Sequence, residues 1–278
     1  MNSAIPDFYT KRVASLPLAA QLAAAVPGST EADWSVLGWR TLARLGAGNA
    51  AVDLTASGDG AYSVDDVDGR TLSLVAENTA TADTLETDAD GVKLAVSGGS
   101  KVTGFRLDMT ALTGWDARKR TWVAVRLSDV VLGNNGDRIH MQITDTVMGA
   151  MTRTLAVPLE RNGAADYRLD LYHYNGIGYD FETTGLLETD ATGTHWLVAE
   201  LTPGRVVARA DLKASAALPD GPAASTKRSE ADYYNRGHST TETTLDALCG
   251  VLRVQLQATG AGACSVTLSD LYILQEGT

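Results

Sequence analysis

Apolar and polar residues alternate along most of the chain from about Val52 onward, and this period of two restricts the fold more than any other feature. Successive side chains of a strand point to opposite faces, so alternation buries one face and leaves the other in water. In residues 122–132, for example, Val123, Val125 and Leu127 share one face. Turn residues follow about every 8 to 12 positions. The sequence therefore predicts an all-β, two-sheet antiparallel sandwich.

The alternation also predicts individual strands and the turns between them. Asn134-Asn135-Gly136-Asp137 separates two alternating runs and favours a hairpin, because Asn-Gly suits the tight turns of hairpins. Pro203-Gly204 predicts a second hairpin, with Thr202 opposite Arg205. The predicted strands are residues 72–75, 93–96, 102–109, 122–132, 139–143, 167–174, 177–183, 195–202, 205–212, 251–258 and 265–274.

Residues 172–181 (YHYNGIGYDF) gather Tyr and Phe in a chain that is only 6% aromatic. If Asn175-Gly176 is the turn, Tyr174 opposes Ile177 and Tyr172 opposes Tyr179. The aromatic residues then share one face, and Leu169, Leu171 and His173 take the other. Two interpretations stay open, which are cross-strand or intersubunit packing and a platform for a sugar ring. The candidate ligand-binding residues, for a glycan or a protein, are Tyr172, Tyr174 and Tyr179.

Residues 1–50 follow a different pattern. Ser29-Thr30 suits a helix N-cap, and the apolar residues after it recur with helical spacing up to Gly46. We therefore expect an N-terminal arm or anchor over 1–50 with one or two short helices, followed by a sandwich domain over 51–278. The residues with helical spacing are Trp34, Leu37, Gly38, Leu42 and Leu45.

Residues 213–244 form a long polar excursion from the predicted sandwich. They are rich in Ala, Ser, Thr, Pro and charge and show no clear period. Loops of this length are uncommon in compact domains and are usually functional or disordered. We expect this one to contact a neighbouring subunit. The candidate partner-contact residues are Trp34 and Trp39 in the arm and Tyr233, Tyr234 and His238 in the excursion.

Charge and hydropathy exclude two kinds of partner. The net charge of −11 and the sequence pI near 4.8 disfavour nucleic acid, since phosphate contacts need clustered Lys and Arg. No apolar run is long enough for a transmembrane helix, so membrane insertion is not expected. The two cysteines, Cys249 and Cys264, are predicted to be buried, reduced thiols rather than a disulfide.

No catalytic constellation stands out, and the chain is predicted not to be an enzyme. The four histidines are scattered without zinc-ligand spacing, and Gly-x-Ser-x-Gly is missing from the sequence. A glycosidase needs two carboxylates across a cleft. Asp180 and Glu182 share a strand face near Asp170, but acidic residues on a wet strand are ordinary in so acidic a chain.

Calcium is the one cofactor left open; none is assigned. Residues 65–69 (DDVDG) and 88–91 (DADG) offer carboxylate oxygens on loops. Neither completes a known calcium-binding loop, and Asp-Gly is also ordinary turn chemistry. We therefore predict no metal site, with calcium as the alternative.

Two segments resemble a known family. Residues 194–212 (THWLVAELTPGRVVARADL) resemble the central hairpin of laminin-G and concanavalin-like sandwiches, where a W-x-x-V strand precedes a tight turn and an R-V-x-x-x-x-D strand. Residues 266–274 (VTLSDLYIL) are similar to the closing strand of many jelly-roll modules. The resemblance implies a concanavalin-like jelly roll, a fold that in tailed-bacteriophage proteins often serves as a spike, fibre or decoration domain. It carries over no ligand-binding residues.

These features lead to one main hypothesis and two alternatives. The main hypothesis is a homo-oligomeric structural virion protein of a tailed bacteriophage (head decoration, spike or tail fibre), assembled in the host cytoplasm. Its arm would dock to other virion proteins, and its sandwich would be displayed. The first alternative is a carbohydrate-binding module that adsorbs to a host surface glycan. The second, less favoured, is a polysaccharide-degrading enzyme.

Overall fold

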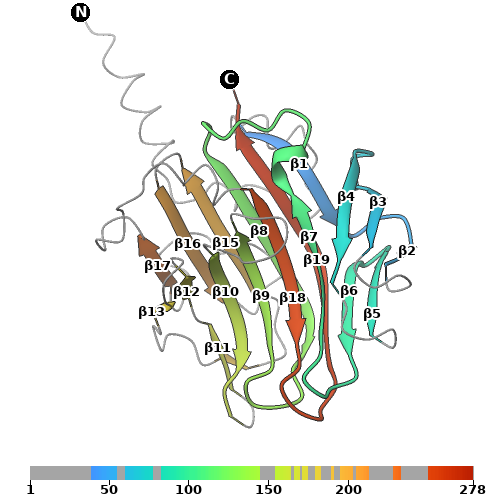
Figure 1. Cartoon of the computed structure of the whole chain (residues 1–278), viewed down its shortest axis with the longest axis vertical. Coiled ribbons are helices and arrows are strands. Elements are labelled where there is room, and N and C mark those ends of the chain that lie inside the picture. Colours follow the sequence, from blue (N-terminus) through green and yellow to red (C-terminus); the bar gives the residue numbers. More distant parts are fainter. Residues whose placement is uncertain are drawn as a thin grey trace, which may run out of the picture.

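Two antiparallel β-sheets stacked face to face make up the computed structural model (Figure 1). This confirms the predicted all-β jelly-roll sandwich. No helix within the described part of the chain is long and apolar enough to cross a membrane. The structure describes residues 39–54, 60–77, 83–144, 154–163, 166–169, 171–174, 179–182, 189–190, 195–202, 205–212, 228–232 and 250–277.

The first sheet, sheet A, has nine strands in the order β17-β16-β15-β8-β19-β6-β5-β2. Strand β1 also pairs with β19, end to end with β6 along the same edge of this long strand. The strands are β1 (Trp39–Gly46), β2 (Val52–Asp53), β5 (Thr84–Asp88), β6 (Gly91–Val96), β8 (Thr121–Val131), β15 (His195–Thr202), β16 (Arg205–Leu212), β17 (Arg228–Asp232) and β19 (Cys264–Glu276).

The second sheet, sheet B, has ten strands in the order β13-β12-β10-β9-β18-β7-β4-β3, with β11 and β14 attached beside β10. A short 3-10 helix, η1 (Met109–Ala111), follows β7. The strands are β3 (Ala61–Asp65), β4 (Thr71–Ala76), β7 (Val102–Asp108), β9 (Arg138–Thr144), β10 (Thr154–Arg161), β11 (Asp166–Leu169), β12 (Leu171–Tyr174), β13 (Tyr179–Glu182), β14 (Thr189–Asp190) and β18 (Val251–Gln257).

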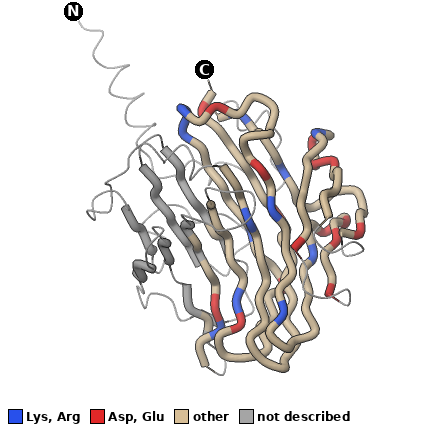
Figure 2. The backbone as a smooth tube through the Cα atoms, in the orientation of Figure 1, with Lys and Arg blue, Asp and Glu red and all other residues tan. Residues whose placement is uncertain are grey.

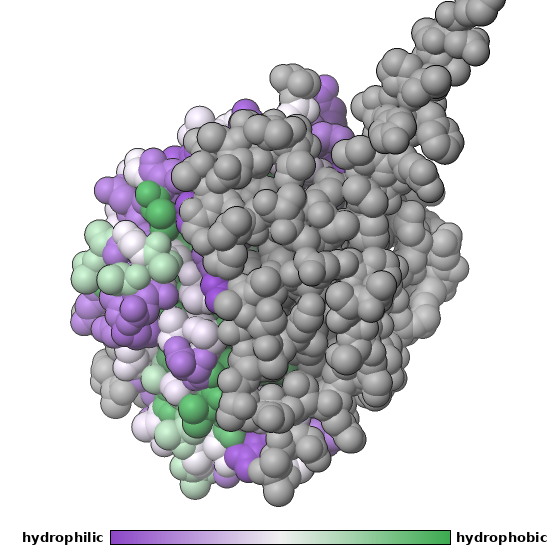
Figure 3. All heavy atoms as spheres, turned by 180° about the vertical axis from the view of Figure 1, so that it is seen from behind, coloured by the Kyte–Doolittle hydropathy of each residue, from purple (hydrophilic) through white to green (hydrophobic). Residues whose placement is uncertain are grey.

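The core lies between the sheets and is built from the alternate residues that the sequence pattern predicted to face inward. Leu74, Phe105 and Val254 of sheet B and Val123 and Ile273 of sheet A are fully buried. Among the described residues, Val131 is the one large apolar side chain that is exposed. Seen from behind, the described surface mixes hydrophobic with hydrophilic residues (Figure 3). Burial of the inward faces is the main driving force for this arrangement.

The helical spacing predicted up to Leu45 is wrong for its described part. Residues 39–46 form strand β1, which pairs with β19 from Trp39 opposite Glu276 to Gly46 opposite Asp270. Nearly every residue of β1 is buried, so the strand lacks the alternation of a half-exposed strand. Residues 1–38 lie outside the described residues. The division of the chain into an arm (1–50) and a sandwich (51–278) therefore remains a prediction, as does the excursion at 213–244, whose described part includes β17.

The hairpin predicted at 134–137 is also wrong. Strand β8 belongs to sheet A and β9 to sheet B, so the connection crosses from one sheet to the other. The connection at 258–263, between β18 and β19, crosses in the same way. We call these two connections the arches. They lie against each other, as the close approach of Gly133 to Ala263 shows. A Cβ added to Gly133 would come within 2.7 Å of the Ala263 carbonyl oxygen.

The side chain of Asp137 joins the two arches and explains why no hairpin forms. Its carboxylate accepts hydrogen bonds from the Asn134 N–H (2.5 Å) in its own arch and from the Thr259 N–H (2.6 Å) and hydroxyl (2.9 Å) in the other. The buried Cys264 thiol also donates to it (3.1 Å). Contacts with the second arch thus determine the conformation of the turn at 134–137.

Cys264 is a free, buried thiol, as predicted; Cys249 lies outside the described residues. Burial raises the pKa of the Cys264 thiol to about 12. The thiol therefore remains protonated at neutral pH and acts as a hydrogen-bond donor rather than a nucleophile.

The Pro203-Gly204 hairpin is confirmed, with Thr202 opposite Arg205 and Leu197, a buried residue, opposite Ala210. The aromatic hairpin differs from its predicted register. Tyr174 pairs with Tyr179, and Tyr172 pairs with Phe181, so the connection spans four residues instead of two. Because the shift is an even number of residues, the aromatic positions still share one face.

We predict that Asp137→Ala lowers the free energy of unfolding by about 2 to 4 kcal/mol, because it leaves several buried donors without an acceptor. Burial by itself would raise the pKa of the Asp137 carboxyl, but its hydrogen bonds with Thr259, Cys264 and Asn134 hold this pKa below its usual value. A carboxyl whose pKa is lowered in the folded state stabilises the protein at pH values above its unfolded-state pKa, which is near 4. This contribution is lost as the pH falls through the folded-state pKa.

Chemical denaturation of both proteins at pH 7 and pH 3 measures this effect. The difference between wild type and Asp137→Ala should shrink on acidification. Asp90→Ala serves as control, because its side chain is 75% exposed and its loss should change stability by no more than about 0.5 kcal/mol. An Asp137→Ala protein as stable as this control would contradict the role given to the carboxylate.

Candidate functional site

Large polar side chains line the outer face of sheet B, the face turned away from the core. On β9, Ile139, Met141 and Ile143 point into the core, so His140 and Gln142 face outward. The strand register brings residues of neighbouring strands into lines across the sheet: His140 lies opposite Gln255, Gln142 opposite Arg253, and Arg253 opposite Arg106. We call the set Glu77, Arg106, Arg138, His140, Gln142, Arg253 and Gln255 the polar strip.

Glu77 holds one end of the polar strip. Its backbone N–H donates to the Gly104 carbonyl (2.8 Å), next to Gln255 in the register. A Cβ on Gly104 would lie 2.1 Å from the Val254 carbonyl oxygen and 3.0 Å from the Gln255 side chain, so only glycine fits against β18 at this position. The Glu77 carboxylate accepts from Arg253 Nε (2.5 Å) and Gln255 Nε2 (2.8 Å) and pairs with Arg106 Nε (2.7 Å).

The bonds continue from Arg253 toward His140. Arg253 Nη1 donates to Gln142 Oε1 (3.5 Å), and Gln142 Nε2 lies 3.1 Å from His140 Nδ1. Burial, together with the positive charges of Arg138 and Arg253, lowers the pKa of His140 to about 3. His140 is therefore neutral at physiological pH. A neutral imidazole between two guanidinium groups presents one donor and one acceptor nitrogen.

Arg138 lies at the opposite end of the polar strip from Glu77. Its Nε donates to Gln257 Oε1 (3.0 Å), and its Nη1 lies 3.5 Å from Glu160 Oε2. The side chains of Arg138 and Arg253 are 30% and 20% exposed, whereas His140 is 7% exposed. The arginines are thus within reach of solvent, and His140 lies deeper.

The aromatic hairpin belongs to the same face. Tyr172 lies opposite Ala156, and Ala156 lies opposite Gln142, so one line runs from Tyr172 to Arg253. Its neighbour His173 lies opposite Leu155, a position on the same side of β10 as that of the buried Leu159. The tyrosine positions therefore follow the outer face, and the position of His173 follows the inner one. With strands about 4.8 Å apart, Tyr172 and Gln142 are roughly 10 Å apart across β10.

Of the predicted partner-contact residues, Trp39 is the one that the structure describes. Trp39 is buried at the start of β1, where its ring stacks on Trp122 with centroids 3.9 Å apart. The Arg120 guanidinium lies 4.9 Å from the Trp39 ring centroid. This stack is packing within the chain. Outside the described residues lie Trp34, Tyr233, Tyr234 and His238.

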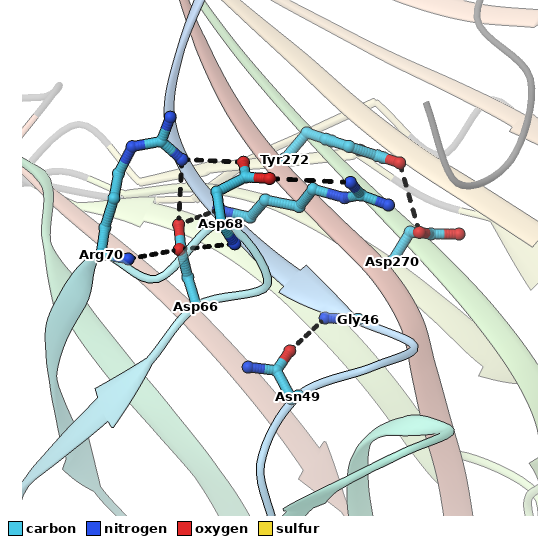
Figure 4. Close-up of polar contacts among 8 residues, drawn as sticks. Gly46, Asn49, Asp66, Asp68, Arg70, Asp270 and Tyr272 are labelled. Carbon is cyan, nitrogen blue, oxygen red and sulfur yellow. Dashed lines mark hydrogen bonds and ion pairs between the residues drawn. The ribbon is translucent and has the colours of Figure 1, made fainter. Parts of the chain in front are cut away.

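The acidic loop 65–69, considered above for calcium, is held by arginines (Figure 4). Asp66 is buried and accepts from the backbone N–H groups of Arg44 (3.0 Å), Asp68 (2.9 Å) and Arg70 (2.8 Å). The Arg70 guanidinium bridges Asp66 and Asp68 (3.3 and 2.8 Å). These bonds tie the β3–β4 loop of sheet B to β1 of sheet A, so the loop closes an edge of the sandwich.

The second acidic loop, 88–91, is engaged in a similar way, because Lys93 pairs with both Asp88 and Asp90. Across the part of the chain that the structure describes, no group of three or more His, Cys, Asp or Glu side chains is placed to hold a metal ion. In both loops a cationic side chain takes the position next to the carboxylates.

The carboxylates considered for glycosidase chemistry do not join the tyrosines. Asp180 lies opposite His173, and Glu182 lies opposite Leu171, at positions that alternate with those of the tyrosines. Asp170 lies outside the described residues. The two carboxylates of sheet B that lie beside the polar-strip arginines, Glu77 and Glu160, are each bonded to an arginine.

The polar strip was missed by sequence reasoning. Its signal was present in the outward positions of two predicted strands, residues 139–143 and 251–258. These positions hold Gln142, Arg253 and Gln255, whose long side chains end in planar polar groups. Their meeting could not be foreseen, because β9 and β18 are far apart in the chain.

We predict that Asp66→Ala lowers the free energy of unfolding by about 2 to 3 kcal/mol, because three backbone N–H donors lose their acceptor. Asp68→Ala, in the same loop but with a partly exposed side chain, should cost about 1 kcal/mol. Thermal unfolding with millimolar calcium and with EDTA provides the metal test. The midpoint should be the same in both, and a higher midpoint with calcium would contradict the arginine-held loop.

Comparison with known proteins gave no match to a family model and no match among curated proteins. Several solved structures are similar to this chain at low identity. One is the CBM2 module of the evolved Dit of Lactobacillus casei BL23 phage J-1, with 12% identity, a TM-score of 0.40, and 87% of this chain and 98% of that chain covered.

Two further structures are of other kinds. Lectin II from Ulex europaeus is 8% identical, with a TM-score of 0.41, and the alignment covers 73% of this chain and 92% of that chain. A GH54 α-L-arabinofuranosidase soaked with a cyclic sulfate inhibitor is 11% identical, with a TM-score of 0.45, and 88% and 60% covered.

Proposed function

We propose that this chain is a carbohydrate-binding β-sandwich that holds its glycan on the outer face of sheet B. The observation that carries the proposal is the register of β12, β10, β9 and β18. It lines up the position of Tyr172 with Gln142 and Arg253. An aromatic hairpin and a row of planar polar side chains thus share one face of one sheet.

The chemistry of these groups matches that of a sugar. A pyranose ring presents an apolar C–H face and a rim of hydroxyls that both donate and accept hydrogen bonds. Tyrosine rings can cover the apolar face, and amide and guanidinium groups can bond neighbouring hydroxyls. In this proposal Tyr172, Tyr174 and Tyr179 stack on sugar rings, and Gln142, Gln255 and Arg253 bind hydroxyls.

Packing alone is the competing explanation for the aromatic hairpin. It accounts for cross-strand pairs such as Tyr172 with Phe181. It gives no reason for His140, Gln142 and Arg253 to occupy outward positions two and three strands away. Ligand binding explains both features together.

The stacking role predicts that Tyr172→Ala and Tyr174→Ala each weaken glycan binding about tenfold, or ~1.4 kcal/mol. A glycan array identifies a bound polysaccharide, and affinity electrophoresis measures the variants. Arg118→Ala is the control, because this side chain is 88% exposed in the turn before β8 of sheet A. Binding unchanged in the tyrosine variants, or no retention on any glycan, would refute the proposal.

We further propose the setting that the sequence suggests, a structural component of a tailed-phage virion such as a head decoration, spike or tail-fibre protein. Trp39 pairs with Glu276, so strand β1 begins at the end of sheet A opposite the arches. Attachment of residues 1–38 to other virion proteins at that end would leave the outer face of sheet B available. The same chain would then form a homo-oligomer that displays a glycan-binding face to a host surface.

This setting predicts that the purified full chain is an oligomer. Light scattering after size-exclusion chromatography should give a mass that is a multiple of 29.3 kDa. Trp34→Ala, or Tyr233→Ala with Tyr234→Ala, should shift the mass toward the monomer, because large aromatic residues dominate stable interfaces. Arg118→Ala should leave it unchanged. A full chain that stays monomeric at high concentration would contradict the oligomeric virion role.

We propose no reaction for this site. The carboxylates beside the proposed site, Glu77 and Glu160, are committed to arginines, whereas glycoside hydrolysis needs a carboxyl that can give up a proton at the scissile bond. A polysaccharide-degrading activity therefore ranks below binding.

A further inference from the structure

The outer face of sheet A, turned away from sheet B, is buried along its central strands. Outward positions there alternate with residues of the core between the sheets, such as Val123 and Ile273. Six of these outward residues are each 3% exposed or less. We call them the sheet A patch: Trp39 and Thr41 on β1, Trp122 and Ala124 on β8, and Tyr272 and Leu274 on β19. A sheet face that met solvent would not be buried so completely.

No described element covers the sheet A patch. Every described strand belongs to one of the two sheets, and the strands form two layers (Figure 1). The described cover consists of two side chains of the face itself. The Arg120 guanidinium lies 4.9 and 5.2 Å from the ring centroids of Trp39 and Trp122, and that of Arg44 lies 5.5 Å from the Tyr272 ring centroid. We therefore infer a further cover over this face.

Polar atoms on the same face indicate the chemistry of that cover. Within the part of the chain that the structure describes, four buried polar atoms have no hydrogen-bond partner: Trp122 Nε1, Thr41 Oγ1, Arg44 Nε and Arg126 Nε. The three nitrogens are donors only, and the hydroxyl can also donate. Buried polar groups without a partner are rare, and each needs an explanation. The cover should therefore bring acceptors, which are carbonyl or carboxylate oxygens.

The distribution of charge favours an acidic cover. In a chain of net charge −11, many acidic residues gather near the edge formed by β2 to β6, and basic residues occur on the central strands (Figure 2). Arg44 and Arg126 both reach the outer face of sheet A, opposite Tyr272 and Asp270. An acidic segment that also carries apolar side chains would match both the guanidinium groups and the rings.

We propose that the sheet A patch is the docking site of residues 27–38 of its own chain. These residues (PGSTEADWSVLG) lead directly into Trp39, which is itself part of the patch. They contain two carboxylates, Glu31 and Asp33, and no Lys or Arg. They also contain Trp34, Val36 and Leu37, apolar side chains that can pack on the rings of the patch.

The length of the segment suits the patch. Five residues separate Trp39 from Arg44 on β1, which is roughly 17 Å along a strand. Twelve residues span about 18 Å as a helix and about 40 Å when extended. Residues 27–38 can therefore cover the patch in either conformation.

Two other connections fit the patch less well. Residues 213–227 connect β16 to β17, which are two and three strands away from β8, and they begin and end with a lysine. Residues 233–249 lead from β17 to β18, a strand of sheet B. Only residues 27–38 adjoin the patch directly.

Docking would give the arm two parts with different roles. Residues 27–38 would protect the outer face of sheet A and fix the position of the arm on the sandwich. Residues 1–26 would remain for the attachment to other virion proteins that we propose above. The inference does not depend on glycan binding, because the aromatic hairpin and the polar strip lie on sheet B.

Hydrogen exchange of the full-length protein, followed by mass spectrometry, tests the docking. We expect amides in residues 27–38 to exchange about tenfold or more slowly than those of an unstructured peptide. In Ala124→Glu, a larger charged side chain stands at the centre of the patch, and exchange of 27–38 should approach the unstructured rate. Strands β9 and β18 should stay protected in this variant, because Ala124 faces away from the core.

Matched variants serve as controls. Ala95→Glu makes the same change at another outward position of sheet A, on β6 and outside the patch, and should leave residues 27–38 protected. If Ala124→Glu does not fold, Glu31→Lys with Asp33→Lys decides, because it alters only the segment. This double variant should lose the protection of 27–38, whereas Lys11→Glu with Arg12→Glu, outside the segment, should keep it.

Three results would overturn the docking. The first is exchange of residues 27–38 at the unstructured rate in the wild type. The second is protection that persists in both Ala124→Glu and the double lysine variant, or that is lost from 213–227 or 233–249 instead. The third is protection that disappears on dilution to the monomer, because the segment would then come from a second copy. A protein that binds no glycan, by contrast, would refute only the proposed function.

Discussion

The buried carboxylate of Asp137 is the contact on which the arrangement of the sheets depends. It binds donors from both arches, the connection from β8 to β9 and the connection from β18 to β19. Because the arches lie side by side, the strands leaving them are neighbours in both sheets: β8 pairs with β19 in sheet A, and β9 pairs with β18 in sheet B. One side chain thus fixes how four strands enter the core. Buried charge is costly unless it is hydrogen-bonded, and here the Asp137 carboxylate meets that condition.

The candidate site follows from the same pairing. His140 and Gln142 on β9 meet Gln255 and Arg253 only because β18 is their neighbour. Glu77 then joins the row from the end of β4, where its N–H bonds the Gly104 carbonyl. On the other side, β10 connects this row to the aromatic hairpin. The outer face of sheet B therefore collects residues from five separate stretches of the chain, and each stretch is held in register by backbone hydrogen bonds rather than by the site itself.

Individual strands and the local hairpin at Pro203-Gly204 were predictable, whereas the pairing of strands distant in the chain was not. Alternation located β4, β6, β7, β8 and β9 within a few residues of their bounds. It failed at β1, where burial on both faces removes the period of two and leaves an apolar spacing that also suits a helix. Asn-Gly at 135–136 is good hairpin chemistry, yet the side chain of Asp137 holds the turn as an arch. The register of the aromatic hairpin differs by two residues from the one that a two-residue Asn-Gly turn predicts.

By itself the sequence determined what each strand could do locally, namely which positions were apolar, which were polar, and which faces they shared. It therefore determined that the fold is a β-sandwich and that the tyrosines at 172, 174 and 179 occupy one face. Only the tertiary structure decided which strands became neighbours, because pairing joins backbone groups that are distant in the chain. That decision turned Gln142, His140, Arg253 and Gln255 from isolated polar residues into one hydrogen-bonded row beside the aromatic hairpin. The physical reason is that alternation is encoded locally, whereas strand order depends on contacts such as those of Asp137 with Thr259 and Cys264.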